Sequence, residues 1–145
     1  MSAASDYLEN KLVDHIFRGI SFTMPSDLYV ALFTAAPSDS GGGTEASGGS
    51  YARAALAPSY SNWKGTNGEV TNTGSAGTGG QTKNAATITF PTPTGNWGTI
   101  THYGLFDAAT SGNLLVHGSL TTSKTVNNGD PAPTFAVDAL VFTFA

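Results

Sequence analysis

Two histidines, His102 and His117, lie on stretches of the sequence that are predicted to pair as antiparallel strands. If residues 107–112 form a six-residue hairpin loop, these two histidines lie directly opposite each other. Directly opposed residues point to the same face of a sheet, with their Cβ atoms about 4.5–5.5 Å apart. Two imidazoles at that distance can share a metal ion, yet no third or fourth ligand is evident. We therefore interpret them as polar residues on the less buried face and predict no metal.

The same register opposes Tyr103 to Val116 and Leu105 to Leu114, on the other face of the hairpin. Asp107 points to that face as well, so it lies away from the two histidines. The hairpin is thus predicted to have one apolar, buried face and one polar face.

Acidic residues are too scattered to suggest an acid–base pair. Glycoside hydrolysis requires two carboxylates that flank a groove, whereas most of the 10 acidic residues lie in the first helix or in polar loops. Asp138 interrupts an apolar stretch whose same face carries Leu140 and Phe142, but a hydrogen-bonded or edge-exposed aspartate explains it without catalysis. The Gly-rich residues 74–80 lack the Gly-Lys-Ser/Thr ending of a phosphate-binding loop. We predict that the protein is not an enzyme and needs no cofactor.

Aromatic side chains that stack on sugars are the remaining candidates for ligand chemistry. The best placed among the 15 aromatic residues are Tyr51, Tyr60, Trp63 and Trp97. Most aromatic residues of a β domain this small belong to its core, but Tyr60 and Trp63 flank a polar loop and are expected to be the most exposed. A glycan-binding or glycan-cleaving module, with a host-surface glycan as its ligand, is therefore kept as a third functional hypothesis.

These residues are carried by a chain with few charges. Gly, Thr and Ser number 18, 20 and 14, or 52 of 145 residues, whereas Lys and Arg number 6 and Asp and Glu 10. Six scattered cations and a formal net charge of −4 make no basic patch, so we expect no nucleic-acid partner. No apolar run approaches the roughly 20 residues of a membrane span, and the first residues lack the features of a signal peptide. We expect a soluble protein that is made inside a cell and has no membrane partner.

Residues 1–19 are predicted to form the helical part of the chain. Ser5 or Asp6 can cap the start of the helix, and Gly19 is a suitable stop. Apolar residues recur at helical spacing at Leu8, Leu12 and Ile16. An amphipathic helix of this kind must lie on an apolar surface, either of its own domain or of a neighbouring subunit.

From residue 26 onward the sequence is typical of short β-strands separated by Gly, Pro and Asn. Residues 28–33 are apolar on both faces, which predicts a central strand covered from both sides. Further strands are predicted within residues 51–60, 85–90, 97–106, 113–120, which residues 121–126 can continue, and 134–144, with a turn at 127–130. The predicted fold is all-β: one domain of residues 1–145 in which residues 26–145 form an antiparallel β-sandwich, jelly-roll-like, with one N-terminal amphipathic α-helix.

Two segments between the predicted strands, residues 35–50 and 64–84, contain almost no apolar residues. Low-complexity Gly/Ser/Thr stretches are flexible unless something orders them, and a compact domain rarely carries long loops without a function. They are interpreted either as mobile surface loops or as segments that become ordered against neighbouring subunits.

Three stretches of the chain carry a resemblance to known proteins. They are residues 28–53 (LYVALFTAAPSD, GGGTE and SGGSYAR), residues 88–107 (ITFPTPTGNWGTITHYGLFD), and residues 112–130 (GNLLVHGSL and NNGD). Together they resemble a family of small virion proteins of tailed bacteriophages, often labelled tail-fibre proteins. The resemblance implies a phage origin, a structural role and a place in the virion, assembled in the host cytoplasm. The family defines no catalytic residues, so none are carried over.

A fibre needs a shaft, usually a repeated trimeric β element or a coiled coil, and the sequence shows neither an internal repeat nor a heptad. We therefore favour a capsid cement (decoration) protein that binds neighbouring subunits through its loops. Uncharged loops suit this role, because backbone groups pair with neighbours without the desolvation of ions. The alternative is a tail-fibre or tail-tip component that binds the host surface.

The implied partners are the major capsid protein or tail proteins of the same phage, together with further copies of the chain in a homo-oligomer. The predicted assembly contacts come from the helix and from the two polar loops with their flanks. They are Leu8, Leu12, Ile16, Asp39, Glu45, Tyr51, Arg53, Tyr60, Trp63 and Lys64.

Overall fold

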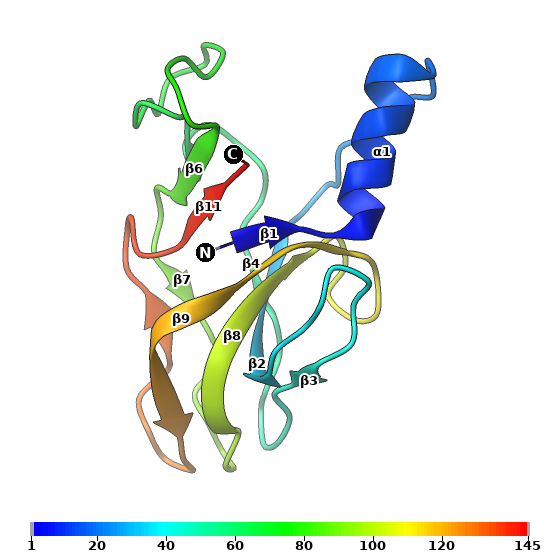
Figure 1. Cartoon of the computed structure of the whole chain (residues 1–145). Coiled ribbons are helices and arrows are strands. Elements are labelled where there is room, and N and C mark those ends of the chain that lie inside the picture. Colours follow the sequence, from blue (N-terminus) through cyan, green and yellow to red (C-terminus); the bar gives the residue numbers. More distant parts are fainter. Residues whose placement is uncertain (1, 145) are drawn as a thin grey trace.

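The computed structural model describes residues 2–144, which form antiparallel β-sheets and a helix near the N-terminus (Figure 1). The prediction of an antiparallel β fold with one N-terminal helix is confirmed. The largest sheet has the order β1–β9–β8–β2–β3, and β4 also pairs with β2. Its strands are β1 (Ser2–Ala4), β2 (Tyr29–Ala35), β3 (Thr44–Glu45), β4 (Ala54–Ala55), β8 (Gly98–Phe106) and β9 (Leu114–Val126).

Two smaller sheets complete the described chain. One has the order β11–β6–β5 and the other pairs β10 with β7. Their strands are β5 (Trp63–Lys64), β6 (Gln81–Asn84), β7 (Ile88–Thr89), β10 (Thr134–Phe135) and β11 (Val141–Thr143). The core lies between them and the large sheet: the Tyr103 ring of β8 packs edge-on against Phe142 of β11 and Phe135 of β10, with ring centroids 5.7 and 6.2 Å apart.

Strand β2 is central, as its apolar sequence predicts. It pairs with β8 along one edge and with β3 and β4 along the other. Its residues Val30 to Phe33 are all buried, which is possible because both faces of the strand are covered. A strand of this kind cannot alternate polar and apolar residues, since neither face meets water.

The register predicted for the β8–β9 hairpin is wrong. Tyr103 pairs with Gly118 and Leu105 with Val116, because the loop closes one residue later and Leu115 is then an extra residue on β9. Asp107 determines the closure: its carboxylate accepts from the backbone N–H of Asn113 (2.7 Å) and from its side-chain amide (2.7 Å). A side-chain loop closure and a bulge are both invisible to an argument from symmetric loop length.

Several predicted strands are much shorter than expected. Within residues 51–60 only Ala54–Ala55 is a strand, and within residues 85–90 only Ile88–Thr89. Residues 134–144 are divided into β10 and β11 by a turn in which Asp138 adopts a positive φ of 66°. The turn is held by Asn84, which is fully buried and bonds to the backbone of Ala136 (2.7 Å) and Leu140 (2.8 Å). Side-chain bonding to the backbone replaces sheet pairing here.

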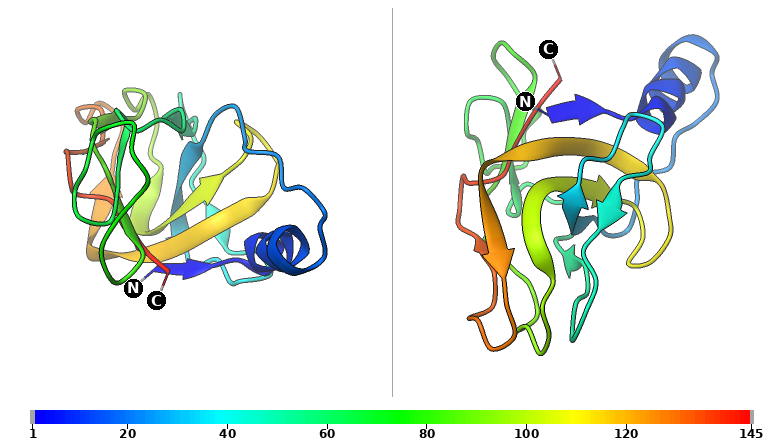
Figure 2. Two further views of the ribbon diagram at one scale, coloured as in Figure 1. Left: turned by 90° about the horizontal axis from the view of Figure 1, so that it is seen from above. Right: turned by 60° about the horizontal axis from the view of Figure 1, so that its bottom comes forward.

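The N-terminal prediction needs one correction. Residues 2–4 are not helical but form β1, which pairs with residues 116–118 of β9. Helix α1 spans Asp6–Phe17, Ser5 is its N-cap, and Gly19 follows its end with a φ of 70°, as a stop residue should. The Ser2 hydroxyl also bonds to the backbone of Thr143 in β11 (2.8 Å), so the two ends of the described chain lie side by side (Figures 1 and 2).

The two polar segments behave differently, although their compositions are alike. Residues 35–50 contain β3 and lie on their own sheet: Ala46 is buried and its backbone N–H donates to Leu32. The second segment, residues 64–84, begins in β5 and ends in β6, and residues 71–80 between them are all exposed. The first segment is therefore ordered by its own chain, whereas the second extends from the fold.

Candidate assembly surface

Helix α1 is anchored to the sheets only by its first turn. The Ser5 side chain is buried, accepts from the backbone N–H of Leu8 (3.2 Å) and donates to the carbonyl of Leu114. The backbone N–H of Ser5 donates to Leu115 (2.9 Å), and Tyr7 and Leu8 pack against the core. Beyond that turn the helix stands away from the sheets (Figures 1 and 2).

The apolar stripe of α1 is left uncovered. No residue of the helix is buried, and the exposed fractions rise along it from 40% at Leu12 to 64% at Ile16 and 79% at Phe17. Leu8, Leu12 and Ile16 follow one another on one face at a spacing of four residues. The opposite side carries an ion pair between Arg18 and Asp14 (3.0 Å) together with the exposed Phe17. The amphipathic helix predicted from the sequence is present, but its own chain does not cover it.

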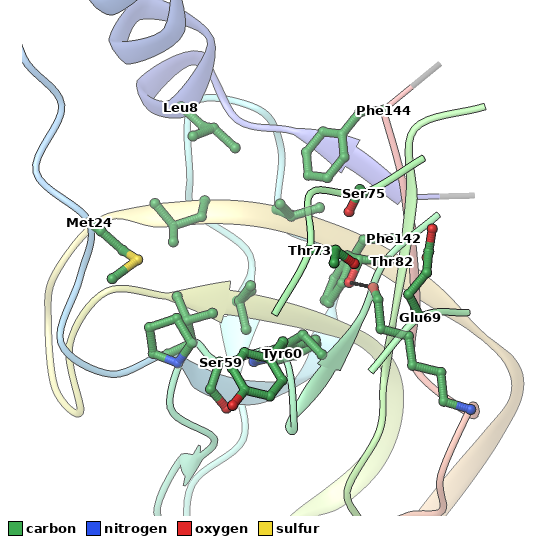
Figure 3. A pocket seen from close by; sticks show the side chains of 18 of the residues that line it. Leu8, Met24, Ser59, Tyr60, Glu69, Thr73, Ser75, Thr82, Phe142 and Phe144 are labelled. Atoms are coloured by element: carbon green, nitrogen blue, oxygen red, sulfur yellow. Dashed lines mark hydrogen bonds between the residues drawn. The ribbon is translucent and has the colours of Figure 1, made fainter. Parts of the chain in front are cut away.

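A largely apolar cleft of about 480 Å³ lies beside the start of this stripe, and we call it the α1 cleft (Figure 3). Leu8 and Met24 line it on the helix side, while Tyr60 and Thr82 lie across from them (Figure 3). Its apolar floor is formed by Leu105, Leu115, Val116 and Phe142, and Trp63 and Phe144 lie at its rim. Because Leu8 belongs both to the cleft and to the helical stripe, the two apolar surfaces are continuous.

Glu69 organises the polar rim of the α1 cleft. Its carboxylate accepts from the backbone N–H of Asn67 (2.9 Å) and of Ala76 (3.1 Å). Hydrogen bonds from backbone N–H groups, its own first and then those of Ala76 and Asn67, hold the pKa of Glu69 below its ordinary value. The ionised carboxylate therefore closes this exposed loop on itself.

Three of the predicted contact residues lie at the rim of the α1 cleft. Tyr60 is 52% exposed, as expected for a residue beside a loop. Trp63 is less exposed than predicted. It is half-buried because its ring packs on Phe142, with ring centroids 6.0 Å apart, and its indole N–H donates to the carbonyl of Leu56. Lys64 is paired with Asp138 at 2.8 Å.

Three other predicted contacts, Glu45, Tyr51 and Arg53, form an internal cluster instead. The Arg53 guanidinium makes two bonds to the Glu45 carboxylate (2.9 and 2.8 Å) and lies 3.6 Å from the centre of the Phe106 ring. Its Nη1 group donates to the carbonyls of Ala108 (2.9 Å) and Ser111 (2.8 Å). With 6% of its side chain exposed, Arg53 joins the first polar segment to the β8–β9 loop rather than presenting a contact.

Tyr51 is bound into the same cluster. Its hydroxyl donates to Glu45 (2.9 Å) and accepts from the backbone N–H of Leu32 (3.0 Å). Burial is the main reason that the pKa of Tyr51 lies far above its ordinary value, so the hydroxyl remains a donor. Its ring packs edge-on against Trp97, which is 3% exposed. These two rings therefore cannot form a platform for sugars.

The two histidines do not face each other. His102 pairs with Ser119 and His117 with Gly104, so the two imidazoles are diagonal neighbours on one face. Diagonal positions are about 7–8 Å apart, in place of the roughly 4.5–5.5 Å of the directly opposed pair predicted above. His117 instead contacts the carboxylate of the exposed Asp39 (2.9 Å), and no cluster of three metal-ligating side chains occurs in residues 2–144.

The structure adds apolar residues that the predicted contacts did not include. They are Val13, Phe17 and Ile20 on and after the helix, Met24 in the segment before β2, and Phe144 after β11, all 45% or more exposed. The helical spacing already indicated Val13 and Phe17. Met24 and Phe144 lie outside the periodic part of any element, so no sequence pattern assigns them to this surface. Of the helices in the described chain, none is long and apolar enough to cross a membrane.

Comparison with known proteins gives one match that covers nearly the whole chain. A family model described as "Podophage GP4 fiber I protein gp80" matches residues 3–143. No curated protein matches the chain.

Proposed function

Because the chain belongs to the family of podophage GP4 fiber I protein gp80, and is therefore a structural protein of a tailed-phage virion, we propose that it is a subunit of a tail fibre. Its expected partners are other tail proteins of the same phage. The family consists of structural proteins, which supports the prediction that the chain has no enzymatic activity.

The family match supports the tail fibre, and the structural observation that supports a role in assembly is the uncovered apolar face of α1 next to the α1 cleft. A protein that works alone in water covers such a surface, since large exposed apolar patches are typical of interaction sites. The charged contacts predicted from the first polar segment, Glu45 and Arg53, are already satisfied within the chain. We therefore propose that the chain is held in the particle through apolar contacts of α1 and not through that segment.

A capsid decoration protein is the second candidate. The compact arrangement of short strands supports it, because residues 2–144 contain neither a repeated β element nor a long helix from which a fibre shaft is built. A fibre subunit of this size would instead be a tip or a joint. Both candidates use the same uncovered face, and they differ in the location and copy number of the chain.

Labelling of purified virions with antibodies to the chain, together with its copy number from quantitative mass spectrometry, tests the proposal. We expect label on the tail and a copy number far below that of the major capsid protein. Label over the head at a comparable copy number would contradict the tail-fibre proposal in favour of decoration. Absence from purified virions would contradict both.

A matched pair of variants tests the role of α1 in incorporation. Leu12→Ser combined with Ile16→Ser makes the middle of the helical stripe polar without touching the core. Val137→Ser removes an apolar side chain of similar exposure, 45%, outside the α1 cleft. We expect virions to lose the double variant and to retain the control.

A further inference from the structure

Most of the large exposed apolar side chains belong to α1, to the segment after it or to the rim of the α1 cleft. Of the ten large exposed hydrophobic residues in the described chain, only Val70 and Val137 lie elsewhere. The other eight are on α1, on the segment after it, or on the rim of the α1 cleft: Leu12, Val13, Ile16, Phe17, Ile20, Met24, Tyr60 and Phe144. Val13 and Phe17 point away from the Leu8–Leu12–Ile16 stripe, and the remaining six expose on the order of 600 Å². With the walls of the α1 cleft, this approaches the roughly 800 Å² that one partner buries in an interface of standard size.

This surface contains both a projection and a recess. The 12-residue helix is about 18 Å long at 1.5 Å per residue, and its apolar stripe stands free beyond the first turn. Beside it the α1 cleft offers an apolar floor of about 480 Å³. The helix stands beside the recess without filling it (Figure 3). Within the described residues of one chain, the apolar stripe of α1 therefore has no surface to pack on, and the α1 cleft has no side chains that fill it.

We propose that the α1 cleft is occupied by α1 of a second copy of this chain, so that two copies pair about a two-fold axis. This inference rests on the proposed function only in taking the uncovered face as an assembly face. A two-fold contact uses the same patch on both copies, so a single patch per chain is sufficient. Because the helix and the cleft lie side by side, a two-fold pair covers both of them in both copies, whereas an open chain of helix-in-cleft contacts would leave one uncovered at each end.

The charges around α1 agree with pairing of like chains. The helix and its cap carry Asp6, Glu9 and Asp14 against Lys11 and Arg18, so two copies of the polar side are close to neutral. A helix that lies on a lipid surface is rich in Lys and Arg on its polar side. An apolar stripe with little net charge around it therefore indicates a protein partner. A second copy of this chain offers a suitable one, because its α1 cleft is apolar.

The mass of the purified full-length chain in solution tests this pairing directly. Light scattering after size-exclusion chromatography should give twice the chain mass of 14.8 kDa. Leu12→Ser combined with Ile16→Ser should give the single-chain mass at the same concentration, with an unchanged circular dichroism spectrum. The control Val137→Ser should keep the double mass.

Disulfide trapping gives a second readout, because the sequence contains no cysteine. In the proposed pair, Leu12 of one copy faces the α1 cleft of the other copy, whose rim carries the exposed Tyr60. Leu12→Cys combined with Tyr60→Cys should therefore link two chains under mild oxidation, whereas Asn10→Cys, on the polar side of α1, combined with Tyr60→Cys should leave them unlinked. Disulfides form only when the two Cα atoms come within about 7 Å, which makes the contrast specific for the geometry.

A single-chain mass at high concentration, together with no link between chains that carry Leu12→Cys and Tyr60→Cys, would overturn the second-copy inference. If the double variant still failed to enter virions in that case, the partner of α1 would be a different virion protein and the proposed function would stand. If the pair formed in solution but purified virions lacked the chain, the proposed function would fail and the inference would stand.

Discussion

Two regions that the sequence marks as assembly contacts use their side chains in opposite ways. Around Arg53, the guanidinium makes its hydrogen bonds to Glu45, Ala108 and Ser111 of the same chain, and it covers the Phe106 ring. Around α1, the polar groups are mostly solvated, and the apolar groups beyond the first turn are increasingly exposed. Charged residues near a polar loop can thus pair entirely within their own chain, whereas an uncovered apolar stripe remains available to a partner.

The largest effect should come from breaking the internal region. Arg53→Ala removes a nearly buried guanidinium and leaves Glu45 and two carbonyls without their donor, which should lower the free energy of unfolding by roughly 3 kcal/mol. Chemical denaturation measures this. Arg18→Ala is the control, because Arg18 is 65% exposed and such surface pairs contribute less than about 1 kcal/mol. Equal losses of unfolding free energy for the two variants would contradict the difference between the buried Arg53 and the exposed Arg18.

The anchor of α1 should give the next largest effect. Ser5→Ala removes the N-cap and a buried hydroxyl that bonds to β9, so we expect a loss of about 1–2 kcal/mol in unfolding free energy. Thermal unfolding followed at a helical wavelength measures it, with the exposed Ser21→Ala as control. A loss no larger than that of the control would mean that β1 alone holds the helix in place.

The free end of α1 should tolerate substitution in the dilute protein. Phe17→Ser changes a side chain that is 79% exposed, so the unfolding free energy at low protein concentration should stay within about 0.5 kcal/mol of the original value. Denaturation at nanomolar concentration checks this. A larger loss would show that Phe17 packs on its own chain, and the two regions would then no longer differ in the way described.

The smallest effect should come from the loop at the rim of the α1 cleft. The folded pKa of Glu69 is lowered, so its bonds to the loop are complete above the ordinary value of 4.5 and are lost as the pH falls through the folded pKa. The amide proton shift of Ala76, measured by NMR, should follow this titration. In Glu69→Gln the shift should not titrate, and a titration that persisted would assign the effect to another group.

Local patterns were sufficient where one element determines its own structure. The helical spacing of Leu8, Leu12 and Ile16 and the stop at Gly19 identify α1 to within a residue or two. The continuous apolar run of residues 28–33 identifies the central strand, because a strand buried on both faces has apolar residues at successive positions. The family resemblance stated from three stretches of sequence is also confirmed, by a match over residues 3–143.

Local patterns failed where distant groups decide the backbone. The β8–β9 register depends on the Asp107 carboxylate and on a bulge, and the division of residues 134–144 depends on the buried amide of Asn84. Neither interaction has a periodic signature. The short strand of residues 2–4 likewise exists only because the edge of β9 is there to pair with it.

The amphipathic helix, the central apolar strand and the membership of a family of phage virion proteins could all be predicted, because each depends on a contiguous run of residues. Which candidate contacts remain available depends on how the chain folds. Arg53 and Tyr51 are drawn inward because desolvated polar groups must find partners within the fold. The stripe of α1 stays outside because the chain anchors the helix by one turn and then leads it away from its own sheets.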